Sequence, residues 1–134
     1  MERTSRTLTG WGCTAPSVAD LVDADAADLT APGALAELTG SRGVIARGLG
    51  RSYGDPAQNG GGTVIRLAPS ATPIVLDAAA GTATVDANVS LDALLREIVP
   101  QGWFVPVSPG TRFVTIGERS ASPAATVRIA AMRR

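Results

Sequence analysis

Residues 46–56 carry the sequence ARGLGRSYGDP, and a second glycine-rich run, NGGG, follows at residues 59–62. Glycines at positions 48, 50 and 54 let the backbone adopt positive φ angles and approach a ligand closely, because they have no Cβ. Backbone amides in such a loop can point into one concavity and bind an anion. We therefore predict that these residues form an anion-binding loop. Its members are Ala46, Arg47, Gly48, Leu49, Gly50, Arg51, Ser52, Tyr53, Gly54, Asp55 and Pro56.

The side chains of this loop favour the same interpretation. Arg47 and Arg51 add positive charge, and Ser52 and Tyr53 carry hydroxyls that can donate to a phosphate oxygen. Either arginine can instead form a structural ion pair, for example with Asp55. A glycine-rich turn that only reverses the chain is the alternative interpretation of the spacing. The run is not the G-x-G-x-x-G dinucleotide fingerprint, because the third glycine is misplaced and no helical pattern follows.

The identity of the residues is more specific than their spacing. RGLGRSYGD followed by AQNGGG resembles the flavin-binding loop of the vanillyl-alcohol-oxidase superfamily, whose members carry a PCMH-type FAD-binding domain. The resemblance continues through LTGWG at residues 8–12, TAPS at 14–17 and PGTR at 109–112. It extends to Gly117 and so covers most of the chain.

The resemblance implies that FAD is the cofactor and that the amides of residues 46–56 grip its pyrophosphate. Tyr53 would lie near the ring system, or would be a buried structural tyrosine. A second segment is also implied to contact the flavin, through Gly110, Thr115, Ile116 and Gly117. Without the resemblance, this segment would be interpreted as a plain Pro-Gly turn.

The activity that the resemblance implies is oxidation of a sugar or alcohol CH–OH group by hydride transfer to flavin N5. We predict no catalytic residue, because the chain has no histidine and none of its carboxylates forms a recognisable acid–base pair. The alternative is a non-catalytic remnant of a flavin domain with no independent activity. An unrelated anion-binding module would require the long match to be coincidental.

Composition limits the other possibilities. A chain of 134 residues, 45% hydrophobic and 18% charged, is typical of one soluble globular domain. Relatives in the superfamily also have a substrate domain, for which this chain is too short. The expected partners, besides the flavin, are therefore that missing substrate domain or a reductase partner of the parent enzyme. We predict no membrane span, no nucleic-acid partner and no metal site, and cytoplasmic location is the default because no secretory signal is evident. Cys13 stands alone, which excludes an internal disulfide.

Residues 118–134 differ in character from residues 1–117. The first 117 residues hold eight Arg against eleven Asp and Glu, a balance of −3, whereas the last 17 hold four Arg against one Glu, a balance of +3. The superfamily continues after Gly117 with a second glycine, small residues, an acid and a His-Gly pair, and none of these is present. We therefore divide the chain into a partial PCMH-type FAD-binding domain at 1–117 and an atypical tail at 118–134, either frameshifted or disordered. We expect such a polypeptide to bind flavin weakly or not at all.

The predicted fold is α+β, the N-terminal part of a PCMH-type FAD-binding domain, with a small mixed sheet and flanking helices. Strands are predicted at 43–47, 63–67 and 103–107, with a hairpin formed by 73–77 and 83–87. A helix capped by Ser90 should bury Leu91, Leu94, Leu95 and Ile98 on one face.

Two further regions have weaker patterns. A short helix is predicted from about Pro32 to Gly40, with Leu35 and Leu38 buried. The acidic stretch at 15–29 predicts a solvated face. Trp103 and Phe104 are predicted to pack in the core.

Overall fold

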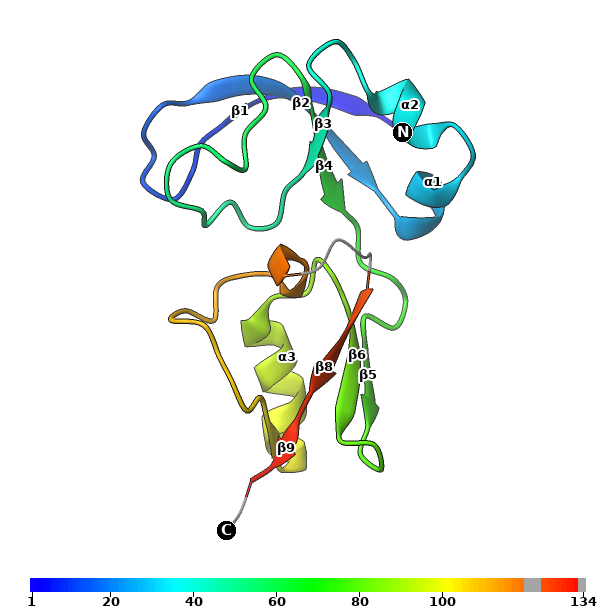
Figure 1. The fold of residues 1–134 in the computed structure, drawn as a ribbon, viewed down its shortest axis with the longest axis vertical. Helices are drawn as coiled ribbons and strands as arrows, with labels where there is room; N and C mark the ends of the chain where they lie inside the picture. The colour runs from blue at the N-terminus through cyan, green and yellow to red at the C-terminus, as the bar shows by residue number, and fades with distance from the viewer. Residues whose placement is uncertain (120–123, 133–134) are drawn as a thin grey trace. The chain divides into compact units, whose positions relative to one another are not determined.

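The computed structural model describes residues 1–119 and 124–132. The chain divides into two compact units, Met1–Ala68 and Pro69–Arg134, each with a sheet and at least one helix (Figure 1). This composition of strands and helices confirms the predicted α+β fold.

The first unit contains a four-stranded mixed sheet in the order β1-β2-β4-β3. The first two strands, β1 (Arg3–Leu8) and β2 (Ser17–Ala24), are antiparallel. Strand β4 (Thr63–Leu67) runs parallel to both β2 and β3 (Val44–Ala46). Two short helices, α1 (Ala26–Thr30) and α2 (Ala34–Leu38), follow β2. Val22, Ala24, Leu38 and Ile65 form the buried cluster of this unit.

Strands β3 and β4 lie where the sequence predicts them, but β1 and β2 were not predicted. The acidic residues of β2 hid it from prediction: Asp20 and Asp23 are exposed, whereas Ala19, Val22 and Ala24 are buried. The solvated acidic face is therefore present, on a strand and on helix α1. Helix α2 is also shorter than expected, and it begins only after Gly33, which has a φ of 82°. Leu38 is buried as predicted, but Leu35 is 49% exposed, because so short a helix presents few inward positions.

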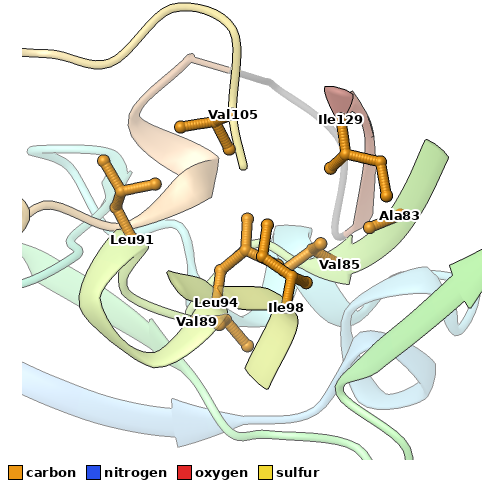
Figure 2. Packing of buried hydrophobic residues seen from close by; sticks show 8 residues of the cluster. All are labelled: Ala83, Val85, Val89, Leu91, Leu94, Ile98, Val105 and Ile129. Carbon is orange, nitrogen blue, oxygen red and sulfur yellow. The ribbon is translucent and has the colours of Figure 1, made fainter. Parts of the chain in front are cut away.

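The second unit contains an antiparallel sheet in the order β5-β6-β8, with helix α3 (Leu91–Ile98) packed against it. Strands β5 (Ile74–Asp77) and β6 (Thr82–Asp86) confirm the predicted hairpin, and its turn contains Gly81 with a φ of 64°. Ser90 caps α3 by accepting a hydrogen bond from the amide of Ala93 at 3.1 Å. Figure 2 shows how the core closes around Leu94 and Ile98, both fully buried.

A 3₁₀ helix, η1 (Val99–Gln101), follows α3 and ends at Gly102, which has a φ of 84°. The strand predicted at 103–107 is reduced to β7 (Trp103–Phe104), which pairs with β9 (Ala130–Ala131). Trp103 is partly buried against the core, but Phe104 is 42% exposed, so its predicted core position is wrong. Successive strand residues face opposite sides, and this places only one of the two rings inward.

Part of the tail belongs to this unit. A second 3₁₀ helix, η2, covers Ile116–Arg119, and β8 (Ala124–Arg128) pairs with β6 along its whole length. Ile129 joins the core with 7% of its surface exposed (Figure 2). Where composition allowed disorder, residues 124–128 and 130–131 thus form strands. Residues 120–123 and 133–134 lie outside the described part.

Neither unit, over residues 1–119 and 124–132, contains a helix with the length and apolar character needed to cross a bilayer. The same residues contain no cluster of side chains suited to a metal ion.

Candidate functional site

The glycine-rich loop joins two parallel neighbouring strands. It leaves β3 at Ala46 and enters β4 at Thr63, and Ala46 is paired with Ile65 across the sheet. Two of the three predicted glycines, Gly50 and Gly54, have φ angles of 65° and 72°. A residue with a Cβ is strained at these angles, which confirms that glycine occurs at both positions because the backbone adopts a positive φ.

The backbone amides of this loop are unpaired. Across the described residues, the amides from Gly48 to Gly54 donate no hydrogen bond to another protein group. The nearest paired amides on the two sides are those of Arg47, which donates to the carbonyl of Ile65 at 2.8 Å, and Gln58, which donates to that of Asp55 at 2.9 Å. Most of these residues are at least partly exposed, so water can serve their amides, and an anionic ligand can take the place of that water.

An N-terminal segment supports the loop closely. Gly10 is buried against Gly54, and a Cβ on Gly10 would overlap the Gly54 carbonyl oxygen. The amide of Trp11 donates to the carbonyl of Ser52 at 3.1 Å. The rings of Trp11 and Tyr53 meet edge to face, with centroids 5.5 Å apart. In the sequence, Gly10 and Trp11 carry only the family resemblance, and no local pattern there indicates their contact with the loop.

Arg47 has a different environment from the one that its sequence position suggested. Its guanidinium donates from Nη2 to the carbonyl of Thr9 and from Nη1 to that of Ala57, both at 2.7 Å. The side chain is partly buried, and this burial lowers the pKa of Arg47 while leaving it charged. No ion pair between Arg47 and Asp55 occurs in the part of the chain that the structure describes.

Other side chains of the loop face solvent. Arg51 and Asp55 are exposed, and no ion pair joins them within the described ranges. Tyr53 is 83% exposed, so the alternative of a buried structural tyrosine is wrong. Its ring meets Trp11, which is itself 57% exposed, and therefore no core covers it. Leu49 is 47% exposed on the same loop.

Asn59 fastens the end of the loop to the sheet. Its side-chain amide donates to the carbonyls of Gly43 at 3.0 Å and Thr63 at 3.2 Å. Gly43 directly precedes β3, and Thr63 is the first residue of β4. The NGGG run is therefore an anchor, whereas the residues before it present the unpaired amides.

The second predicted segment lies in the other unit and its amides are paired. Ile116 donates to the carbonyl of Val89 at 2.9 Å, and Gly117 donates to that of Ala87 at 2.7 Å. Gly117 approaches Ala87 so closely that a Cβ would lie 2.6 Å from the Ala87 Cβ. These two amides are engaged within the protein in this structure, so they are not available to a ligand.

Two predicted residues line a pocket within this unit. The pocket has a volume of about 710 Å³ and is mainly apolar. Thr115, which is 5% exposed, and Ile116 contribute to its wall, together with Leu91 from α3 and Val127 from β8. Gly110 is exposed and does not line it.

Asp92 holds the start of this second segment. Its carboxylate accepts a hydrogen bond from Arg96 Nε at 2.8 Å, and its other oxygen forms an ion pair with Arg112 Nε at 2.8 Å. The amide of Asp92 also donates to the Arg112 carbonyl at 3.0 Å. The hydrogen bond from Arg96 lowers the pKa of Asp92, and the charges of both arginines act in the same direction. The segment around Arg112 is therefore tied to the first turn of α3.

Comparison with known proteins places the chain in a class. Residues 29–117 match the family described as FAD binding domain. The chain belongs to this family, and FAD is the cofactor of the family. The predicted resemblance to PCMH-type oxidoreductases is confirmed.

One relative is particularly similar. The chain is 49% identical over 115 residues to decaprenylphosphoryl-beta-D-ribose oxidase of Mycolicibacterium smegmatis (strain ATCC 700084 / mc(2)155). The match covers 85% of this chain and 25% of that protein. The chain thus spans about a quarter of the length of the curated relative that it matches.

Solved structures show the same fold. A solvent-stable cholesterol oxidase matches with a TM-score of 0.67 and 19% identity, over 87% of this chain and 23% of its own. A mutant of cholesterol oxidase from Brevibacterium sterolicum matches over the same shares with a TM-score of 0.60 and 11% identity. At these identities the likeness concerns the fold alone, and it agrees with the N-terminal part of an FAD-binding domain.

Proposed function

We propose that this chain is the FAD-binding portion of a flavin-dependent oxidoreductase that acts on the CH–OH group of a sugar or alcohol. The observation that carries the proposal is the run of unpaired amides from Gly48 to Gly54, held between two anchored ends. The relative at 49% identity is named as an oxidase of a ribose derivative, which supports this substrate class.

The loop fits the diphosphate of FAD. Its amides from Gly48 to Gly54 are donors without an acceptor among the described residues, and Arg51 supplies an exposed positive charge on the same loop. Ser52 adds a hydroxyl donor. The buried Gly10 leaves room for the loop to fold tightly, as a ligand cradle requires.

The second unit has a small-molecule pocket of its own. Thr115 and Ile116 line a pocket whose volume, about 710 Å³, lies in the range of small-molecule sites. FAD, when bound, supplies the capacity to accept a hydride from a substrate carbon. The residues of this chain would bind and orient the cofactor.

A non-catalytic role for this polypeptide alone is the second candidate. Two of its aspartates, Asp23 and Asp92, are paired with arginines and so are unsuited to proton transfer. The chain has no histidine. We therefore expect binding without turnover, with an affinity weaker than that of complete flavoenzymes.

Titration of FAD into the purified chain tests the proposal. We expect quenching of flavin fluorescence with a Kd of about 1–100 μM, because only part of a full cofactor envelope is formed. ADP should compete, since it carries the same diphosphate, whereas riboflavin should compete poorly. No binding at millimolar FAD would overturn the proposal for this polypeptide.

A further inference from the structure

We propose that Arg47 is a positioning residue: its guanidinium ties Thr9 to Ala57 and thereby fixes the loop that presents the unpaired amides, while the ligand meets Arg51 instead. The inference rests on the proposed function only for the identity of the ligand. It separates two arginines that look equivalent in the sequence.

The guanidinium of Arg47 bridges two backbone carbonyls. The two nitrogens at the tip of the guanidinium each donate to a different carbonyl, one before the loop and one near its end, both at 2.7 Å. The planar guanidinium can satisfy two such acceptors at once, whereas the compact ammonium group of lysine is less suited to bridging them. Arg47 is therefore an internal cross-link between the Gly10 segment and the loop.

Gly50 packs directly against the guanidinium of Arg47. A Cβ on Gly50 would overlap Nη2. The glycine thus leaves the space that the cross-link occupies. Because the tip is partly buried and engaged with carbonyls, it has less freedom to follow an incoming phosphate than the exposed Arg51.

The first test measures amide exchange in the ligand-free protein. The amides of Trp11 and Gln58 report on the loop, because they donate to the carbonyls of Ser52 and Asp55. In Arg47→Ala, their exchange should rise at least about tenfold relative to the amides of β4, since two charge-assisted hydrogen bonds are lost. Arg47→Lys should give a smaller rise, and Arg51→Ala should give none. Unchanged exchange in Arg47→Ala would overturn the proposal.

The second test separates positioning from direct contact. ADP binding is measured at several salt concentrations and at a temperature where circular dichroism shows each variant folded. Arg47→Ala should weaken binding without changing its salt dependence, whereas Arg51→Ala should also flatten the salt dependence. A flattened salt dependence in Arg47→Ala, or unchanged affinity, would overturn the positioning role.

Two provisions keep these tests decisive. If Arg47→Ala does not fold, Arg47→Lys replaces it, because the compact ammonium group keeps the charge but is less suited to bridging both carbonyls. If the unaltered chain binds no ADP or FAD, the proposed function fails for this polypeptide. The exchange measurement still decides whether Arg47 fixes the loop.

Discussion

Gly10 lies against the carbonyl oxygen of Gly54, at a distance that leaves no room for a side chain on Gly10. This contact joins the segment between β1 and β2 to the tip of the glycine-rich loop. The neighbouring Trp11 amide then donates to Ser52 at 3.1 Å. The loop owes its shape to this support as well as to its own glycines.

Gly10→Ala should therefore distort the loop. We expect a loss of unfolding free energy of about 1–3 kcal/mol, which is typical of overpacking in a closely packed site, together with loss of FAD binding. Gly12→Ala is the matched control, because a Cβ there would meet only Thr14 Oγ1, at an ordinary 3.9 Å. Urea denaturation and FAD titration measure both effects. If the two variants lost equal unfolding free energy and equal FAD affinity, the contact between Gly10 and Gly54 would not be what shapes the loop.

Arg51→Ala should lower FAD affinity by about tenfold and reduce the sensitivity of binding to salt, because a charged contact with the diphosphate is lost. The control is Arg6→Ala on the exposed strand β1, which removes a charge of the same sign far from the loop in sequence. Fluorescence titrations at low and high salt provide the comparison. An affinity loss of the same size in Arg6→Ala would indicate only a general charge effect.

Asp92 should make the second unit sensitive to acid. Its two arginine partners lower its pKa in the folded protein. The carboxylate therefore stabilises the fold fully above the pKa of the unfolded state, about 3.9. This stabilisation is lost as the pH falls through the lower pKa of the folded state. Asp92→Asn should lower the thermal midpoint at neutral pH, and the difference from the unaltered protein should vanish in strong acid.

Asp20→Asn is the control for this pH series, because Asp20 is exposed on β2 and forms no ion pair in the described part of the chain. The thermal midpoint of Asp20→Asn should equal that of the unaltered protein at each pH of the series. A difference between Asp92→Asn and the unaltered protein that persists below about pH 2 would show that charge is not the cause.

Ile129→Ala should destabilise the second unit by about 2–4 kcal/mol, because it removes a buried side chain from the core around α3. Val75→Ala on β5, where the side chain is 52% exposed, should cost much less. Fluorescence of Trp103 reports on this unit once Trp11 is replaced by phenylalanine, since the chain has two tryptophans. Equal stability of the two variants would show that the tail does not pack against the core around α3.

The origin of the tail stays a separate prediction. We expect that resequencing the gene across codon 117 and translating the other frames will reveal the small residues and the His-Gly pair of the superfamily. If no frame continues the pattern, the frameshift hypothesis is wrong. The strand pairing of β8 with β6 does not distinguish these outcomes, because short β-branched segments form strands whatever their origin.

Local signals in the sequence determined part of this structure. Glycine placement predicted the loop because a positive φ is a property of single residues, and Gly50 and Gly54 adopt it. The period of Leu91, Leu94 and Ile98, together with the Ser90 cap, predicted α3, because helix capping and amphipathicity act over a few residues. Residue identity in the loop was specific enough to indicate the FAD-binding family.

Only the tertiary structure decided which loop groups are available to a ligand. Arg47 and Arg51 differ because Thr9 and Ala57 provide acceptors for the first and not for the second, and no local pattern encodes those partners. The amides of Ile116 and Gly117 are likewise paired with carbonyls of the segment before α3, whereas those from Gly48 to Gly54 have no partner among the described residues. Local conformation depends on neighbouring residues, but hydrogen-bond pairing and burial depend on segments brought together by folding.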